Sequence, residues 1–306
     1  MINLNYTQQV VLLVAYLIIF FHDWYYAIHK AHEKTIYVLR DFFRMQLTHL
    51  LQFNVVLVYI FVGVPLIIRT ILFPKTIYKN WFYLAKAVLF VLGIDVRVFG
   101  ALPKDGNFVV VGNHTSFLDI FLTAYYFNGK KGTVFLHKKL LKVPVLGWWM
   151  KRLGVIPILP PTVKYESATL EQVRQKTFSE KISAWMLPEI KVTKREMAEI
   201  NIAGKNKALK TLSEGNCLVV FAEGTRTSNG QMKQFEDSAF SMAKKAGVPV
   251  IPIAFVGSYE AKPKWRHYIK PMPVIIRIGK PIDGSTMSVK EFAEKTQHIV
   301  QEMIDE

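Results

Sequence analysis

From about residue 95 to the carboxyl end, short apolar segments alternate with segments of helical periodicity. Each apolar segment has the length of a buried strand, and turn residues or a helical pattern follow it. The expected strands are 108–112, 132–136, 155–159, 217–222, 248–255 and 273–278, and the expected helices are 116–127, 205–214, 238–246 and 288–304, with a helix or turn region at 138–152. Ser288 and Glu291 have the spacing of a capping box at the start of the last helix. This alternation predicts an α/β domain with a mixed sheet.

The first candidate site directly follows the expected strand 108–112. His114 lies where that strand ends, and Asp119 lies about one turn into the next helix if Thr115 or Ser116 caps it. A carboxylate that accepts a hydrogen bond from one ring nitrogen fixes the tautomer of an imidazole and makes the other nitrogen a better base. The alternative is a helix-capping aspartate beside an incidental histidine.

The second candidate site follows the expected strand 217–222. Glu223, Gly224, Thr225 and Arg226 come directly after it, and the glycine permits close approach to the backbone. The Arg226 guanidinium has the fork of donors that suits a phosphate. The alternative is an ordinary surface turn with one ion pair. Two polar turns at the same edge of one sheet favour a shared cleft, because open α/β sheets bind ligands at the carboxyl ends of their strands.

The chain is strongly basic, with a formal net charge of +16. Residues 129–152 contain seven Lys and Arg, among them Lys138, and no acidic residue. Such a segment either docks on anionic headgroups or attracts an anionic substrate, and both can hold together. Nucleic-acid binding is a further class compatible with this charge, but no zinc-finger, helix-turn-helix or RNA-recognition pattern is present, and we expect no nucleic-acid partner.

Other kinds of chemistry have little support in the sequence. The single cysteine, Cys217, falls inside an expected strand, which makes it a poor candidate for a nucleophile and excludes a disulfide scaffold. No group of His and carboxylate residues has metal-ligand spacing. We therefore expect neither a metal nor a resident cofactor.

The first 92 residues differ from the rest because they hold long apolar runs. The runs are 10–21, which is too short to span a bilayer, 50–68, which is the best transmembrane candidate, and 81–92, which is interrupted by Lys86 and is amphipathic or interfacial. Basic residues flank the run 50–68 on both sides, so charge does not choose an orientation. A shallow helical hairpin, a single span and buried helices of a soluble domain remain the three interpretations. We divide the chain into membrane-anchoring helices at 1–92 and an α/β domain at 93–306, with a nearly neutral helical insertion at 161–204.

The ordered set of motifs resembles the glycerolipid acyltransferase family. The motifs are His114-x4-Asp119 after a buried strand, Lys138 ahead of Pro144 and Gly147, the segment 154–157, Phe221 to Arg226, and the segment 250–253. The best-known members of that family are 1-acyl-glycerol-3-phosphate acyltransferases, and the resemblance covers about residues 80–280 without the insertion. It implies a mixed-sheet acyltransferase domain preceded by membrane-embedded helices.

The resemblance also implies roles for the candidate residues. His114 is the expected general base and Asp119 its partner, while Glu223, Gly224, Thr225 and Arg226 hold the glycerol and phosphate of the acceptor, with Lys138 near the same site. The expected acyl donor is acyl-CoA or acyl carrier protein, and the expected location is the membrane, with the catalytic domain on the cytoplasmic face. Backbone N–H groups between Gly112 and Ser116, or in the Gly224 turn, are candidate donors to the oxyanion.

Two departures from the family pattern leave the acceptor open. Pro160 and Pro161 stand where the family usually has a second phosphate-binding arginine, and 236–239 reads Glu-Asp-Ser-Ala where the family has a Lys-Gly-Ala-like step. Lys151, Arg152, Lys164 or another residue of the insertion is a possible replacement for that arginine. Glycerol 3-phosphate, a lysophospholipid and a lyso-aminolipid remain alternative acceptors, and a catalytically silent membrane scaffold is the alternative from another class.

Overall fold

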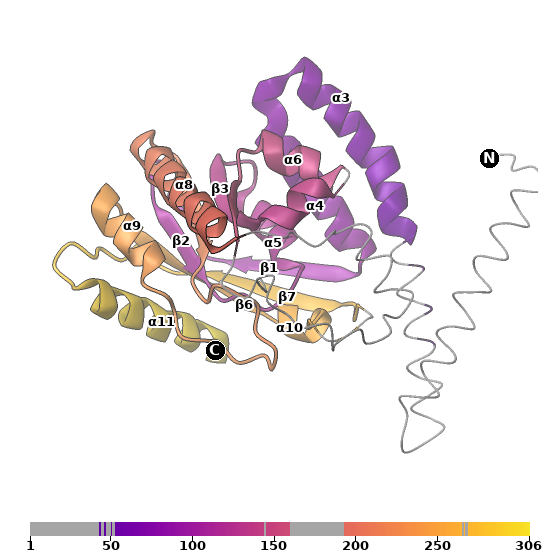
Figure 1. Ribbon diagram of the computed structural model, residues 1–306. Coiled ribbons are helices and arrows are strands. Elements are labelled where there is room, and N and C mark those ends of the chain that lie inside the picture. Colours follow the sequence, from indigo (N-terminus) through magenta and orange to yellow (C-terminus); the bar gives the residue numbers. More distant parts are fainter. Residues whose placement is uncertain are drawn as a thin grey trace, which may run out of the picture.

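The computed structural model of the chain describes residues 53–143, 145–159, 193–264, 266 and 269–306, together with 43, 46 and 50. Most of the expected insertion, residues 161–192, and the apolar run 10–21 lie outside these ranges, so the predictions made for them are not addressed by the structure. The described part forms a sheet covered by helices on both faces (Figure 1).

The sheet contains seven strands in the order β1-β7-β6-β2-β5-β3-β4. Their bounds are β1 Ile94–Phe99, β2 Val109–Gly112, β3 Gly132–His137, β4 Ile156–Ile158, β5 Cys217–Phe221, β6 Val250–Val256 and β7 Met272–Ile278. Neighbouring strands from β6 to β4 are parallel, β7 is antiparallel to β6, and β1 is parallel to β7. The predicted mixed sheet is therefore confirmed.

One strand, β1, was not expected from the sequence. It lies at one end of the strand order, and most of its side chains are exposed or half-buried. Its sequence, IDVRVF, alternates apolar and charged residues instead of forming a continuous apolar run. An edge strand with one solvent-exposed face has such an alternation, whereas a continuous apolar run indicates only an interior strand.

The helices form two layers, and each layer has its own apolar core. The bounds are α3 Val64–Leu72, α4 Ile77–Val91, α5 Asp119–Phe127, α6 Leu146–Arg152, α8 Lys194–Ser213, α9 Ser238–Ala246, α10 Ser258–Ala261 and α11 Val289–Asp305, with short 3-10 helices at Pro74–Thr76 and Lys138–Lys142. On β2, Val110 packs into the core that contains α4, α5 and α6, while Val109 and Val111 pack into the core that contains α8, α9 and α11. Side chains that alternate along one strand therefore pack into the cores of both layers.

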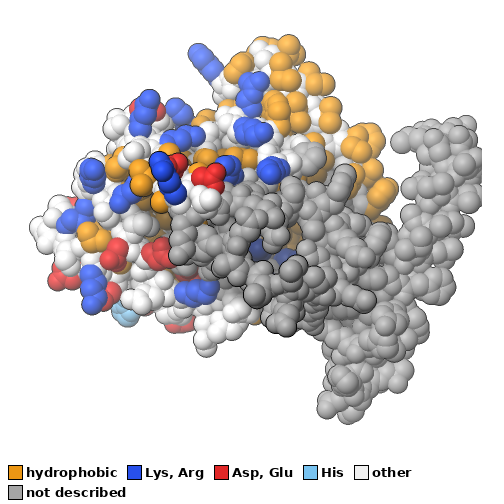
Figure 2. All heavy atoms as spheres, viewed as in Figure 1, with side chains coloured by type: hydrophobic (Ala, Val, Ile, Leu, Met, Phe, Trp, Pro, Cys, Tyr) orange, Lys and Arg blue, Asp and Glu red, His pale blue; other side chains and the backbone are white. Residues whose placement is uncertain are grey.

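The region of the run 50–68 is helical and largely uncovered. In the described part of the chain, one helix, Phe53–Leu72, is long and apolar enough to cross a membrane, with a mean hydropathy of 2.5 and 17% of its most apolar window buried. The exposed side chains include Phe61, Ile68 and Leu72. Figure 2 shows hydrophobic side chains gathered over this part of the molecule, around α3.

Helix α4 covers the third apolar run and is amphipathic, as expected. Trp81, Leu84 and Val88 on one face are buried in the core shared with α5. Trp81 lies 5.9 Å from the Phe121 ring of α5 and 6.0 Å from the Trp149 ring of α6, measured between centroids. The apolar face of this helix is therefore part of the α/β domain core.

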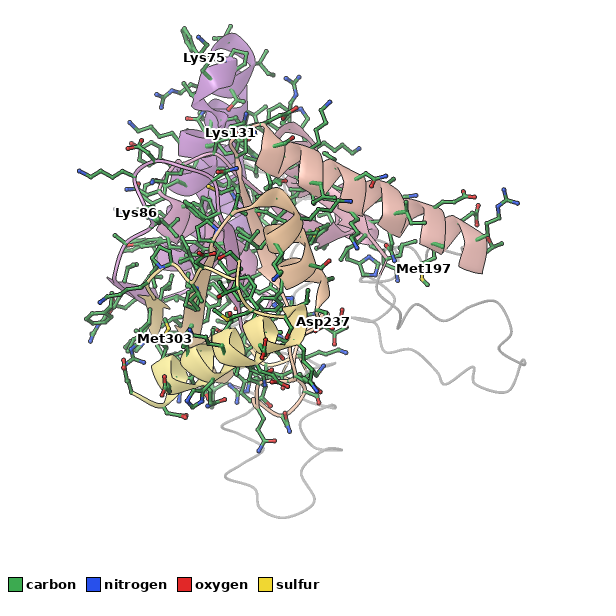
Figure 3. All side chains as sticks on the ribbon, turned by 90° about the vertical axis from the view of Figure 1, so that its left-hand side faces the viewer. Lys75, Lys86, Lys131, Met197, Asp237 and Met303 are labelled. Carbon is green, nitrogen blue, oxygen red and sulfur yellow. The ribbon has the colours of Figure 1, made fainter. Side chains whose placement is uncertain are left out.

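Two helices begin at residues other than the predicted ones. Helix α5 begins at Asp119, three residues after the predicted start, because the Asp119 carboxylate accepts hydrogen bonds from the preceding turn. Helix α8 begins at Lys194, eleven residues before the predicted start, and so includes the end of the expected insertion 161–204. Thr193 and Glu196 form a capping box there, a signal that the sequence contains and the prediction overlooked. Figure 3 shows α8 leading away from the rest of the domain toward Met197. The capping box predicted at Ser288 and Glu291 is confirmed at α11.

Candidate active site

The two polar turns identified in the sequence lie side by side because β2 and β5 are neighbouring parallel strands. Gly112, the last residue of β2, is in register with Phe221 of β5 and with Ile253 of β6. A Cβ atom on Gly112 would lie 2.4 Å from Ile253 Cγ2 and 2.7 Å from the Ile253 carbonyl oxygen, so a side chain does not fit. A glycine at this position lets the end of β2 lie close to β6, beside the end of β5.

His114 and Asp119 form a hydrogen-bonded pair at this edge. His114 Nδ1 lies 2.8 Å from Asp119 Oδ2, and the same oxygen accepts hydrogen bonds from the backbone N–H groups of Thr115 and Ser116, both at 2.9 Å. The Asp119 side chain is completely buried. A buried carboxylate with three donors is fixed in position, and so is the imidazole that it binds.

The His114 ring is also held from one side by an aromatic ring. It stacks on Phe221 with a centroid distance of 4.2 Å and an interplanar angle of 20°. The His114 side chain keeps 25% of its surface exposed. With Nδ1 donating to Asp119, Nε2 is the ring nitrogen left to accept a proton.

Glu223 connects the two turns instead of facing the cavity. Its Oε1 accepts a hydrogen bond from the His114 backbone N–H at 2.8 Å, and its Oε2 accepts one from the Lys233 backbone N–H at 3.0 Å. Burial raises the pKa of the Glu223 carboxyl, and the two backbone donors partly oppose that rise. Glu223 therefore braces the backbone of His114 and does not line the cavity, whereas the resemblance implies that it holds the acceptor.

The Arg226 guanidinium has no hydrogen-bond or ion-pair partner among the described residues. Burial lowers the pKa of its guanidinium, and the nearby charge of Asp119 opposes that change. The preceding Gly224 has φ +68°, a conformation that favours glycine, and this allows the sharp turn that brings Arg226 to the cavity. A half-buried guanidinium without a carboxylate partner suits an anionic ligand.

Lys233 holds the Gly224 turn from outside. Its ammonium donates to Thr225 Oγ1 at 2.8 Å and to the Arg226 carbonyl at 3.2 Å.

The backbone N–H groups predicted to bind an oxyanion mostly have acceptors within the protein. The N–H groups of His114, Thr115 and Ser116 all donate to carboxylates, and that of Gly224 donates to the Phe221 carbonyl at 3.1 Å. Among the donors predicted for an oxyanion, these four are thus already used, whereas the N–H groups of Thr225 and Arg226 have no acceptor within the described residues.

His114 and Arg226 line the same cavity, which has a volume of about 710 Å³. Gly224 and Thr225 line it as well. Its apolar wall comes from α4, α5, α6 and the central strands and includes Trp81, Ile120, Phe127, Leu136, Met150 and Leu153. The cavity thus combines a polar mouth with an apolar interior.

Lys138 does not line this cavity. It begins the 3-10 helix after β3, and its charge acts on Glu196 at the start of α8. Its neighbour Lys139 lines the cavity, together with Lys130, Lys205 and Lys264. Sequence reasoning did not single out Lys205 or Lys264, because neither lies in a motif or in the basic segment 129–152. Figure 2 shows Lys and Arg side chains over the region between α8 and α6.

Further residues hold the His114 turn in place. The Asn113 side chain donates to the Phe255 carbonyl at 3.0 Å and accepts from the Phe255 N–H at 2.8 Å, so it ties the end of β2 to β6. The Thr115 hydroxyl forms a hydrogen bond with the hydroxyl of Ser258, which is buried at the start of α10.

Cys217 lies at the opposite end of β5 from the Glu223 turn, and burial raises the pKa of its thiol. The described residues contain no cluster of three metal-ligating side chains.

Comparison with known proteins identifies relatives of this chain. The family model described as Acyltransferase matches residues 94–199 and 191–256. The chain is 28% identical over 198 residues to a chloroplastic 1-acyl-sn-glycerol-3-phosphate acyltransferase of Brassica napus, with 62% of this chain and 45% of that protein covered. It is 29% identical over 221 residues to the 1-acyl-sn-glycerol-3-phosphate acyltransferase of Saccharomyces cerevisiae, with 70% and 60% covered. The chain thus spans about half the length of these curated relatives.

A solved structure has the same fold. The 1-acyl-sn-glycerophosphate acyltransferase PlsC from Thermotoga maritima superposes with a TM-score of 0.65 at 25% sequence identity, over 86% of this chain and 97% of that one. The family match covers more than half of the chain and includes both polar turns. The chain therefore belongs to the Acyltransferase family.

Proposed function

We propose that this protein transfers a fatty acyl group from an acyl thioester to the free hydroxyl of a lysophosphatidic-acid-like acceptor in phospholipid biosynthesis. One observation carries the proposal: an imidazole held by a buried carboxylate shares a cavity with a guanidinium that has no anionic partner in the described structure. The names of the relatives support the choice of acceptor.

His114 acts as the general base in the proposed reaction. Its Nε2 takes the proton of the acceptor hydroxyl as the oxygen attacks the thioester carbonyl carbon, and Asp119 stabilises the imidazolium that forms. The carbon–sulfur bond then breaks, and the imidazolium returns the proton to the departing thiolate. The products are a thiol and an ester, and no acyl-enzyme forms.

The Gly224 turn provides donors to the charges of the substrates. Arg226 binds the acceptor phosphate, and the N–H groups of Thr225 and Arg226 are the remaining candidates for the tetrahedral oxyanion. Glu223 acts through the backbone of His114 and is a positioning residue. The apolar wall of the cavity accommodates acyl chains.

The proposed donor is acyl-CoA or acyl carrier protein, and no resident cofactor takes part. We place the protein at a membrane, with the exposed apolar face of Phe53–Leu72 in the lipid and the catalytic domain on the cytoplasmic side. Acceptor and product are lipids, so this placement brings the cavity to its substrates.

Acyl transfer by the full chain in detergent tests the proposal. Labelled acyl-CoA and acyl carrier protein are each offered with lysophosphatidic acid, glycerol 3-phosphate, a lysophospholipid or a lyso-aminolipid. We expect lysophosphatidic acid to have the highest kcat/KM, and His114→Ala to lose about 10²–10⁴-fold in kcat, the usual contribution of a general base.

A matched control is His298→Ala, because His298 is exposed on α11 and pairs with Glu302 at 3.3 Å. This variant keeps its activity. Normal turnover by His114→Ala refutes the base assignment, a different preferred acceptor refutes the substrate, and a wild-type chain inactive with every acceptor supports the silent scaffold instead.

A further inference from the structure

The sheet opens between β3 and β5. Over residues 132–134, β3 is in register with β5, and over residues 135–137 it is in register with β4 instead. On its other side, β5 stays in register with β2 as far as Phe221. The two strands therefore separate after Val134 of β3 and Val219 of β5, and we call this opening the β3–β5 gap.

The cavity that contains His114 reaches both helical layers through this gap. Its lining includes Val134 and Val219, which pack into the core with α4, α5 and α6. It also includes Phe135 and Val220, the next residues of the same two strands, which pack into the core with α8, α9 and α11. One cavity therefore has two branches, one on each side of the sheet.

The two branches differ in polarity. The branch toward α4, α5 and α6 is lined mainly by apolar side chains, among them Trp81 and Leu153, and we call it the apolar branch. The branch toward α8 is lined by Lys139, Asn201 and Lys205, and we call it the basic branch. An acyl chain suits the first branch and a polar, anionic group suits the second.

Lys139 is positioned by the end of β3. Its backbone N–H donates to His137 Nδ1 at 3.2 Å, at the start of the 3-10 helix. Burial and the charge of Lys139 lower the pKa of His137, so the imidazole is neutral at neutral pH and can accept this hydrogen bond. The Lys139 ammonium forms no hydrogen bond or ion pair within the described residues.

Lys205 is positioned by the attachment of α8 to β4. The Asn201 side chain accepts from the Leu159 N–H at 3.0 Å and donates to the Leu159 carbonyl at 3.0 Å. Residues four apart lie on the same face of a helix, so Lys205 faces the cavity together with Asn201. Its ammonium, like that of Lys139, has no partner in the described part of the chain.

No carboxylate neutralises these two ammonium groups. Among the described residues that line the cavity, Glu236 is the one acidic residue. It lies against the Gly224 turn, where a Cβ atom on Gly224 would be 2.7 Å from Glu236 Oε1. The basic branch thus offers two ammonium groups whose donors are unpaired in the described structure, which suits a phosphate.

An acyl thioester at His114 extends in two directions from its carbonyl group. In the proposed reaction its acyl chain enters the apolar branch, and the acceptor phosphate lies beside Arg226. The basic branch is the route that remains for the thiol part of the donor. In acyl-CoA and in acyl carrier protein alike, that part is a phosphopantetheine arm, which has polar amides and ends in a phosphate.

We infer that the basic branch of the cavity binds the phosphopantetheine arm of the acyl thioester, and that Lys139 and Lys205 bind its phosphate. The inference rests on the function proposed above. It assigns the acyl donor to a part of the cavity that is separate from Arg226, so donor and acceptor meet at His114 from different sides.

Steady-state kinetics of the full chain in mixed micelles test this inference with the double variant Lys139→Met, Lys205→Met. The donors carry one acyl chain on coenzyme A, on acyl carrier protein or on N-acetylcysteamine, which lacks the phosphate. We expect KM for the phosphate-bearing donors to rise about tenfold, as for loss of hydrogen bonds to a charged group, with kcat changed less than about threefold. KM for the N-acetylcysteamine thioester and for the acceptor stays the same. The phosphate-bearing donor with the higher kcat/KM in the wild type is the source of the arm.

The matched control is the double variant Lys210→Met, Lys245→Met, which removes the same charge from exposed positions on α8 and α9 that do not line the cavity. Its kinetics match the wild type with every donor. The double variant Lys139→Arg, Lys205→Arg keeps both charges and retains most of the affinity for the donor. A thermal melt of each variant shows that it is folded.

An unchanged KM for the phosphate-bearing donors overturns the inference, and so does an equal rise for the N-acetylcysteamine thioester or an equal rise in the control. If the wild type transfers no acyl group to any acceptor, the proposed function fails, and calorimetric titration with phosphopantetheine then decides about the basic branch by itself. Weaker binding by the variant Lys139→Met, Lys205→Met than by the wild type upholds the phosphate site. Equal binding, or no binding by the wild type, overturns it.

Discussion

The two sides of the cavity mouth differ in how completely their polar groups are paired. On the side of His114, one Asp119 oxygen accepts three hydrogen bonds, and Glu223 holds the backbone of His114. On the side of Arg226, the guanidinium has no hydrogen-bond or ion-pair partner in the described structure. On the first side only Asp119 Oδ1 is buried without a hydrogen-bond partner in the described structure, whereas the second side presents a guanidinium without one.

The difference between the two sides corresponds to two tasks of the site, proton transfer and binding of a charged ligand. A base must be held in one orientation to accept a proton, so hydrogen bonds and ring stacking fix the imidazole of His114. A group that binds a charged ligand must keep donors unpaired, and the protein tolerates the unpaired charge. We therefore expect substitutions on the first side to lower kcat, and substitutions on the second side to raise KM.

The sharpest test of the paired side is Asp119→Asn. A carboxamide oxygen in the place of Asp119 Oδ2 still accepts from His114, Thr115 and Ser116. It has no negative charge to stabilise the imidazolium, so we expect kcat to fall by about 10²–10⁴-fold with KM little changed. Single-turnover acyl transfer measures the chemical step. Asp237→Asn, at an exposed position before α9, is the control. A loss expressed in KM alone contradicts the assigned role.

The next test is Glu223→Gln, which distinguishes a brace from a substrate contact. An amide accepts through one oxygen only, so either the His114 or the Lys233 N–H loses its acceptor. We expect the free energy of unfolding to fall by about 1–3 kcal/mol and kcat to fall by about tenfold because His114 is less well positioned. Denaturant unfolding and kinetics are measured on the same preparation.

Glu236→Gln provides the comparison for that test, because Glu236 lines the cavity at an exposed position. It leaves the free energy of unfolding unchanged. If Glu223→Gln lowers kcat without lowering stability, Glu223 contacts the substrate, and its assignment as a brace is wrong.

The smallest expected effect concerns Lys262, which follows α10, and the dependence of stability on pH. Burial, together with the charges of Arg226 and Arg266, lowers the pKa of the Lys262 ammonium to about 8.

The same lowered pKa has a defined effect on stability. Because the ordinary pKa of lysine, near 10.5, is restored on unfolding, the unfolded chain binds more protons than the folded one between about pH 8 and 10.5. The contribution of Lys262 to the free energy of unfolding therefore increases with pH over that window. Thermal melts of the wild type and of Lys262→Met therefore differ by a constant amount below about pH 8 and converge between about pH 8 and 10.5.

Much of the sheet could be predicted because its interior strands are continuous apolar runs, and each polar turn directly follows one of them. β1 was not predicted because only one of its faces is apolar. The start of α8 was not predicted because it lies in a polar stretch where hydrophobic periodicity is weak. The place of Lys138 was not predictable either. A motif gives its position in the chain, but the direction of its side chain depends on the packing of the following 3-10 helix.

The pair of His114 and Asp119 could be predicted from the chain alone, because five residues between a strand end and a helix start leave few ways to arrange them. The sequence also indicated that two polar turns follow strands of one sheet, but the structure is what shows these strands, β2 and β5, to be neighbours. Tertiary structure alone decided that Glu223 turns toward the backbone of His114 and that Lys262 lies within electrostatic reach of Arg226. Those contacts join segments distant in the chain, and they exist only because β5 and β6 pair on either side of β2.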